Sequence, residues 1–171
     1  EVVLLCSATC IFVAGTWTRA RMWWAVFSLF AYMTAAICDG FVGSGGLRDA
    51  LDGAVAAHIN GPLRNDVFGH GGRWLALLVG GLLTFVAMRR PQRRVASEYF
   101  GALMLVTVGM MLVARANDLV LLFVALELVS VPLYVLLFLG RRDRLTAEAS
   151  VKYFFLSILA SALLLYGLSF L

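Results

Sequence analysis

The sequence predicts an all-α integral membrane protein with about six transmembrane helices. Hydrophobic residues make up 62% of its 171 positions and charged residues 14%, whereas an ordinary soluble domain has roughly 45–50% apolar and 25% charged residues. The apolar residues form six long runs, and arginines gather between the runs. A long apolar run in lipid is expected to be a helix, because each backbone group then finds its hydrogen-bond partner within the same segment.

The six runs are each interpreted as one helix. They cover residues 2–17, 22–38, 74–88, 99–114, 119–139 and 146–171. The first and third runs are near or below the length that crosses about 30 Å of hydrocarbon. We therefore expect flanking residues to extend these two helices, or the bilayer to thin around them.

A long glycine-rich connection, at about residues 39–73, separates the second and third runs. Within it, Leu47, Leu51, Val55 and Ile59 recur every four residues. This spacing is typical of the apolar face of an amphipathic helix. The connection is therefore predicted to contain a short helix lying on the membrane surface.

No metal site or disulfide framework is predicted. Two of the three cysteines, Cys6 and Cys10, lie four residues apart in the first apolar run, and the sequence has no CxxC or Cys/His spacing. His58 and His70 have no companion ligands at a suitable spacing, so we interpret them as ordinary surface residues.

The arginines predict the orientation of the chain. The connections after the first, third and fifth runs hold nine arginines, and short arginine-rich connections usually face the cytoplasm. Both termini are then expected on the outer, periplasmic side. These arginines also account for the net charge of +4, so nucleic-acid binding is not expected. Because the chain starts at Glu1 without a methionine and stops within an apolar run, we expect it to be a portion of a longer protein.

Glu127 lies in the middle of the fifth apolar run, about 21 Å of helix before Arg141. A charged carboxylate at the centre of a spanning helix costs about 2.5–3.5 kcal/mol, so such residues usually face protein or water and usually have a function. We interpret Glu127 as a carboxyl that takes up and releases a proton. The alternative is a buried hydrogen bond that holds helices together.

Three neighbours support Glu127 in this interpretation. Ser130 is on the next turn and Tyr134 two turns on, so both add hydroxyl groups near the acid. Pro132 has no N–H and leaves the carbonyl of Leu128 without its intrahelical donor, which predicts a kink about one turn from Glu127. A kink beside a buried acid suits a hydrated path for ions.

Lys152 is the single lysine among the 14 basic residues. Thr146 is expected to cap the sixth helix, with Glu148 in its first turn, so Lys152 would lie roughly 9 Å inside the helix. One interpretation is an interfacial lysine that reaches back to the cytoplasmic side. The other is a proton-handling residue, because lysine can lose its proton in a protein and arginine cannot. Across two antiparallel helices, Glu127 and Lys152 would differ in depth by about 9 Å.

Residues 98–167 contain, in order, the segments GMM, ND, LELVSVPLYVL and EASVKYF. This stretch closely resembles subunit N of the proton-pumping NADH-quinone oxidoreductase, respiratory complex I. Residues 1–97 are similar to that family as three helices with a variable loop. The resemblance implies two domains, with residues 1–97 as the N-terminal helices and residues 98–171 as the start of a proton-conducting repeat.

The resemblance implies the first part of an antiporter-like fold with inverted repeats. Glu127 and Lys152 match the acid and the first lysine of the family's first proton half-channel. The chain itself would have no catalytic residue and bind no flavin, iron–sulfur cluster or nicotinamide, while the complex uses NADH and quinone. Its partners would be the lipid bilayer of the inner membrane and the other membrane subunits of complex I.

Two alternatives remain open from the sequence. Large subunits of multi-subunit sodium/proton antiporters share the motif, so the chain could belong to one of these. A structural or assembly module without transport activity is the other alternative, because the chain ends before the repeat is complete.

Overall fold

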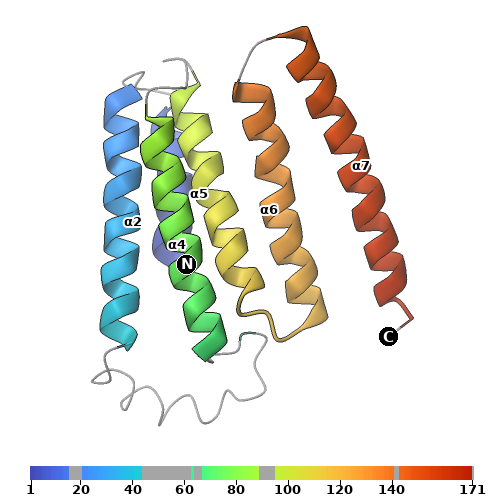
Figure 1. Ribbon diagram of the computed structural model, residues 1–171, viewed down its shortest axis with the longest axis horizontal. Helices are drawn as coiled ribbons and strands as arrows, with labels where there is room; N and C mark the ends of the chain where they lie inside the picture. The colour runs from blue at the N-terminus through green and yellow to red at the C-terminus, as the bar shows by residue number, and fades with distance from the viewer. Residues whose placement is uncertain (16–20, 44–62, 64–66, 89–94, 141–142, 171) are drawn as a thin grey trace.

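The computed structural model describes residues 1–15, 21–43, 63, 67–88, 95–140 and 143–170. In this part of the chain, α-helices stand side by side and alternate in direction (Figure 1). Their bounds are α1 Val2–Gly15, α2 Arg21–Gly43, α4 Val67–Ala87, α5 Ala96–Val113, α6 Leu119–Gly140 and α7 Arg144–Leu168. Five of them are long and apolar enough to cross a membrane, and α1 is a shorter apolar helix of 14 residues. The predicted helical membrane fold is confirmed.

The second and third helices extend into the connection predicted at residues 39–73. α2 continues to Gly43 and α4 already begins at Val67, which makes α4 21 residues long. The added turns carry Asp39, His70 and Arg73, which contact one another across the two helices. Hydropathy predicted the end of the second helix too early and the start of the third helix too late, because these turns contain polar residues and glycines. The predicted surface helix at residues 47–59 and His58 lie outside the described residues.

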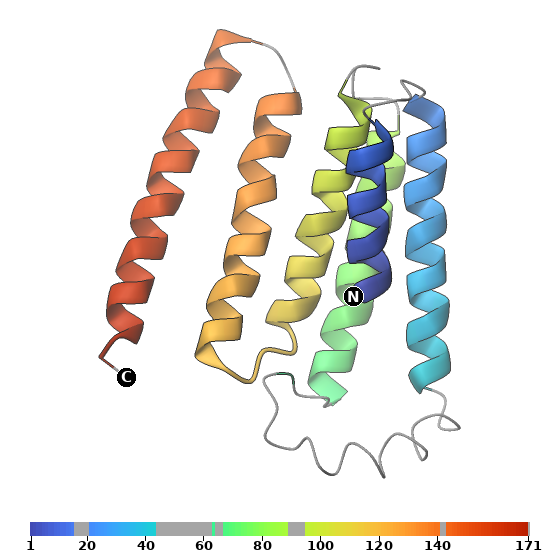
Figure 2. The same ribbon diagram turned by 180° about the vertical axis from the view of Figure 1, so that it is seen from behind.

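α5 is the central helix and packs against α1, α2, α4 and α6. Viewed from behind, α1 lies in front, and it packs against α5 and α2 (Figure 2). Two glycines of α5 allow close helix contacts. A Cβ added to Gly101 would lie 2.8 Å from Cε2 of Phe12 in α1, and one added to Gly109 would lie 2.9 Å from the backbone N of Val129 in α6. Small residues of this kind are typical of helix interfaces in membranes, where close packing holds helices together.

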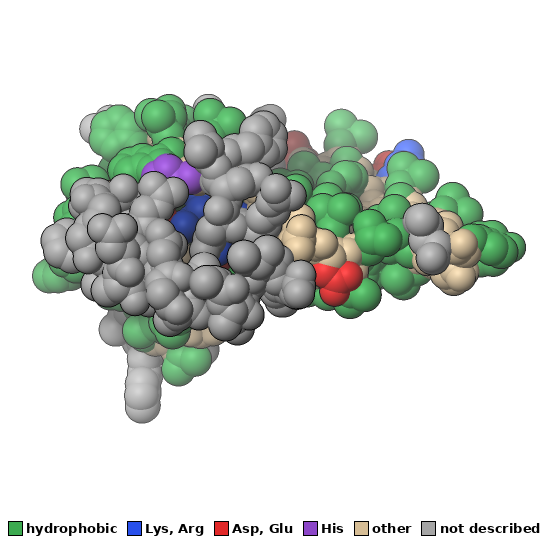
Figure 3. Space-filling view, turned by 90° about the horizontal axis from the view of Figure 1, so that it is seen from below, with side chains coloured by type: hydrophobic (Ala, Val, Ile, Leu, Met, Phe, Trp, Pro, Cys, Tyr) green, Lys and Arg blue, Asp and Glu red, His purple; other side chains and the backbone are tan. Residues whose placement is uncertain are grey.

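The packed interior lies between α1, α2, α4 and α5. Leu4 and Ile11 of α1 meet Met104 and Val108 of α5 in this core, and all four are fully buried. A buried polar contact crosses the same region, where the Tyr32 hydroxyl and the Thr107 hydroxyl lie 2.8 Å apart. Seen from the end at which α4 begins, apolar side chains line the flanks of the bundle, and a histidine and basic side chains lie at this end (Figure 3).

α7 lies at the edge of the bundle and packs antiparallel to α6, as predicted (Figure 1). Most of its side chains are exposed, and its large apolar residues, such as Phe155 at 65% and Leu163 at 62%, face away from the rest of the chain. α7 begins at Arg144, after the N-cap residue Asp143. The prediction that Thr146 caps this helix is therefore wrong, and Glu148 lies beyond the first turn.

Candidate functional site

Glu127 lies near the middle of α6 and is half-buried. Its Oε1 accepts a hydrogen bond from the hydroxyl of Ser161 in α7. The acid thus faces the neighbouring helix, where its hydrogen-bond donor is a neutral hydroxyl group. A neutral donor stabilises the carboxylate without supplying a compensating charge.

A second contact fixes the register between α6 and α7. Seven residues after Glu127, the ring of Tyr134 meets the ring of Phe154 edge to face, with centroids 5.2 Å apart. Phe154 in turn lies seven residues before Ser161. The two contacts therefore agree with one antiparallel alignment, in which about two helical turns separate them on both helices.

The face of α7 that meets α6 carries small hydroxyl residues. Successive members are four, seven and four positions apart. These spacings correspond to about one, two and one helical turns, so all the members lie on the same side of the helix. Its members are Thr146, Ser150, Ser157 and Ser161, all buried or half-buried. The side chains around them on α7 are mostly exposed. These small side chains allow α7 to lie close to α6 and leave room for the Glu127 carboxyl.

Lys152 is not buried in this chain. Its side chain is 70% exposed, and its Nζ lies 2.6 Å from Oε1 of Glu148, one turn earlier on the same helix. Lys152 precedes Ser161 by nine residues, which is about two and a half turns and about 13 Å of helix. It therefore faces away from α6, and its depth differs from that of Glu127 by more than the predicted 9 Å.

The three residues that were predicted to support Glu127 make other contacts or are buried. The Ser130 hydroxyl donates to the carbonyl of Leu126, at 2.9 Å, within its own helix. Tyr134 packs its ring against Phe154. Pro132 is buried, and α6 continues as one helix through it; the kink predicted at this residue stays a prediction.

Ser161 and Gly109 were not singled out from the sequence. The spacing of the α7 hydroxyls could have indicated Ser161, because it marks one face of that helix. Gly109 is the glycine of the GMM segment, and its lack of a side chain brings α5 against the α6 backbone two residues from Glu127. The role of Gly109 depends on which helix packs against it, and the sequence pattern within α5 does not reveal that neighbour.

A second group of charged residues lies among α1, α2, α4 and α5. Asp39, 3% exposed, pairs with the Arg73 guanidinium, and Arg115 Nη1 lies 3.2 Å from Oε1 of Glu1. Arg73 Nε also lies 3.9 Å from the same Glu1 oxygen, which links the two pairs. Opposite charges face each other throughout this group.

His70 belongs to the edge of this charged group. Its Nδ1 lies 3.9 Å from Oδ2 of Asp39, and its Nε2 accepts a hydrogen bond of 3.1 Å from the Trp74 indole. The side chain is 42% exposed, so the predicted surface position holds, although the ring also contacts the buried aspartate.

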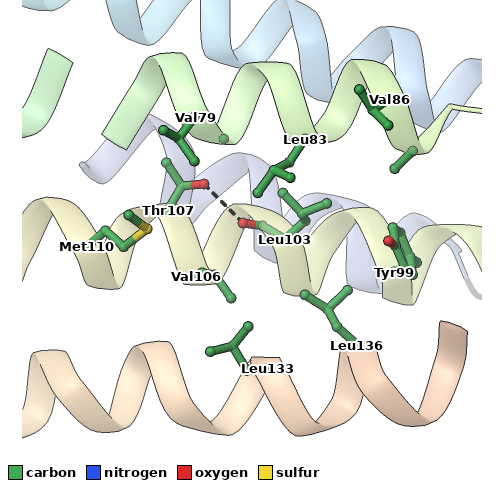
Figure 4. Close-up of a pocket in the computed structure, with 12 residues that line it drawn as sticks. Val79, Leu83, Val86, Tyr99, Leu103, Val106, Thr107, Met110, Leu133 and Leu136 are labelled. Atoms are coloured by element: carbon green, nitrogen blue, oxygen red, sulfur yellow. Dashed lines mark hydrogen bonds between the residues drawn. The ribbon is translucent and has the colours of Figure 1, made fainter. Parts of the chain in front are cut away.

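The described part of the chain contains no cluster of three metal-binding side chains from histidine, cysteine, aspartate and glutamate. A pocket of about 260 Å³ lies between α4, α5 and α6 (Figure 4). Aliphatic side chains such as Leu83, Val106 and Leu133 form most of its lining, and the Thr107 hydroxyl there donates to the carbonyl of Leu103 at 3.1 Å. This lining suits hydrocarbon better than a charged group.

Comparison with known proteins assigns these helices to a family. The family described as "NADH:quinone oxidoreductase/Mrp antiporter, TM" matches residues 116–171, which include α6 and α7. NADH-quinone oxidoreductase subunit N from Anaeromyxobacter sp. (strain Fw109-5) is 34% identical over 144 residues, which are 82% of this chain. The chain belongs to the subunit N family.

Other subunit N proteins are similarly related. The protein from Cutibacterium acnes is 48% identical over 83 residues, 48% of this chain, and the one from Paramagnetospirillum magneticum is 36% identical over 127 residues, 73% of this chain. The matched regions are 28%, 15% and 26% of the three relatives. This chain therefore spans less than a third of the length of the subunit N relatives that it matches.

Proposed function

We propose that this chain contributes a proton half-channel to the membrane part of a proton-pumping NADH-quinone oxidoreductase, with Glu127 as the group that takes up and releases the proton. The observation that carries the proposal is a carboxyl near the middle of a spanning helix that accepts a hydrogen bond from the neutral Ser161 hydroxyl. A carboxylate paired with arginine would be held in its charged form. The Ser161 hydroxyl can bond to either form of the Glu127 acid.

Lys152 is proposed as the second proton-handling group, acting on Glu127 from a distance. The two charges lie at least about 13 Å apart, because their depths already differ by this much, so they interact by at most about 1 kcal/mol at an effective dielectric constant of about 20. A change in the charge of Lys152 would then alter proton occupancy at Glu127 about tenfold or less. The coupling needs no direct contact, which agrees with the opposite faces on which the two residues lie.

The remaining chemistry is assigned to other parts of the complex. NADH and quinone would react in other subunits, and this chain would bind none of the redox cofactors and no nucleic acid. Its partners would be other membrane subunits of complex I, in the inner membrane. By its arginine distribution, the end at which α1, α4 and α6 finish would face the cytoplasm, and both termini the periplasm.

A sodium/proton antiporter subunit is the second candidate, because the matching family description also names the Mrp antiporter. The relatives described above are all subunits of NADH-quinone oxidoreductase, which favours the first candidate. Purification of the full-length protein from its native membrane tests this choice. NADH dehydrogenase subunits in the purified complex support the proposal, and antiporter subunits contradict it.

The half-channel is tested by Glu127→Gln in the full-length protein, assembled in its complex in membrane vesicles. We expect proton pumping per NADH oxidised to fall at least severalfold, because glutamine keeps the shape of the side chain but cannot carry the proton. Glu98→Gln is the matched control, since Glu98 is also bonded by a serine hydroxyl, that of Ser97 at 3.0 Å, but lies in the first turn of α5. Normal pumping by Glu127→Gln in a fully assembled complex would exclude the proposed role.

A further inference from the structure

We propose that Ser161 is a positioning residue for proton exchange at Glu127. This inference rests on the proposed function, because it concerns the same carboxyl group. Ser161 would hold the carboxylate when Glu127 is charged and accept its hydrogen when Glu127 is protonated. The hydroxyl would thus keep the acid at the α6–α7 contact in both charge states.

The direction of the Ser161 hydroxyl is the first observation. Several other hydroxyls on these helices donate to a backbone carbonyl three or four residues earlier in their own helix, namely those of Ser7, Ser28, Thr34, Thr107, Ser130 and Ser150. Ser161 instead donates across the helix interface to Oε1 of Glu127. The Tyr134–Phe154 ring contact two turns away supports the same register, so the bond follows from how the helices pack.

The chemistry of a hydroxyl makes this exchange reversible. A serine O–H donates to a carboxylate, and its oxygen can accept from a protonated carboxyl group. In the second state, the Ser161 hydrogen can turn to the carbonyl of Ser157 four residues earlier, as Ser150 does toward Thr146 at 2.8 Å. One proton passes between water and a Glu127 oxygen, where an O–H bond forms or breaks. Ser161 keeps its own proton throughout.

A lysine or arginine at the position of Ser161 could not act in this way, because neither charged side chain accepts a hydrogen bond. Each would also hold Glu127 in its charged form. The charged pair of Lys152 and Glu148 lies on the other side of α7, so it leaves the contact with Glu127 to the hydroxyl. Ser157, one turn from Ser161 on the same face, provides a matched position for comparison.

The test is the pH profile of proton pumping by the assembled complex with Ser161→Ala. This change removes the hydrogen bond that positions the Glu127 carboxyl group at the α6–α7 contact. We expect the acid side of the profile to move up by about one pH unit. Ser161→Thr keeps the hydroxyl and should retain the original profile, and Ser157→Ala should leave it unchanged. In the Glu127→Gln background, Ser161→Ala should have no further effect on pumping.

An unchanged profile in Ser161→Ala overturns the inference, and so does an equal shift in Ser157→Ala or in Ser161→Thr. If Ser161→Ala does not assemble, Ser161→Cys, with a similar size and a weak donor, replaces it and should give the same direction of shift. Normal pumping by Glu127→Gln would instead refute the proposed function. Loss of pumping in Glu127→Gln together with an unchanged Ser161→Ala profile would refute the role of Ser161 alone.

Discussion

Two buried or half-buried carboxylates in this chain have contrasting surroundings. Asp39 lies among the packed helices α1, α2, α4 and α5, where it pairs with the Arg73 guanidinium and contacts His70. Glu127 lies at the α6–α7 contact, where it accepts a hydrogen bond from the Ser161 hydroxyl. The first carboxylate faces a full positive charge, and the second faces a neutral donor.

This difference in surroundings separates Asp39, which helps to hold helices together, from Glu127, which we propose to change its charge. The Arg73 guanidinium supplies a positive charge opposite the Asp39 carboxylate, so this pair links α2 to α4. The Ser161 hydroxyl supplies no charge opposite Glu127, and a hydroxyl can bond to either form of an acid. The packing around the two carboxylates differs as well. Asp39 is buried among packed helices, whereas Glu127 contacts α7, whose side chains are mostly exposed.

The largest expected effect comes from Asp39→Asn. This change removes the carboxylate nearest to the half-buried Arg73 guanidinium and leaves it only the more distant Glu1 carboxylate, at 3.9 Å. The free energy of unfolding should therefore fall by up to about 3–5 kcal/mol. Denaturant unfolding of the purified full-length protein in detergent measures the loss. The double variant Asp39→Asn with Arg73→Gln should recover most of the stability, because neither charge is then unpaired. A loss below about 1 kcal/mol in the single variant would show that the pair is not structural.

A smaller effect is expected from Gly109→Ala at the α5–α6 contact. The added Cβ would meet the Val129 backbone at 2.9 Å, which is too close, so α6 must shift and stability should fall by about 1–3 kcal/mol. Gly81→Ala is the matched control, since a Cβ there meets nothing within 4 Å. Because alanine favours a helix, Gly81→Ala should keep or raise stability by up to about 1 kcal/mol. Equal losses in both variants, measured by the same unfolding assay, would contradict the close α5–α6 contact.

The sequence could predict the helices and the depth of Glu127, because both depend on apolar runs within one segment. It could not predict the Asp39–Arg73 pair, since these residues lie in polar turns of two different helices and hydropathy assigned them to a loop. The contact between Glu127 and Ser161 depends on the register of α6 against α7, which no single helix contains. Lys152 could be singled out by its type, but the helix face that it occupies became clear only from the packed pair.

Glu127 is proposed to change its charge during turnover, and infrared difference spectroscopy of the assembled complex during NADH oxidation measures this directly. The absorption of Glu127 is identified as the carboxyl signal that disappears in Glu127→Gln. We predict that this signal alternates between the protonated and ionised forms during turnover. A Glu127 carboxyl that remains in one charge state while protons are pumped would contradict it.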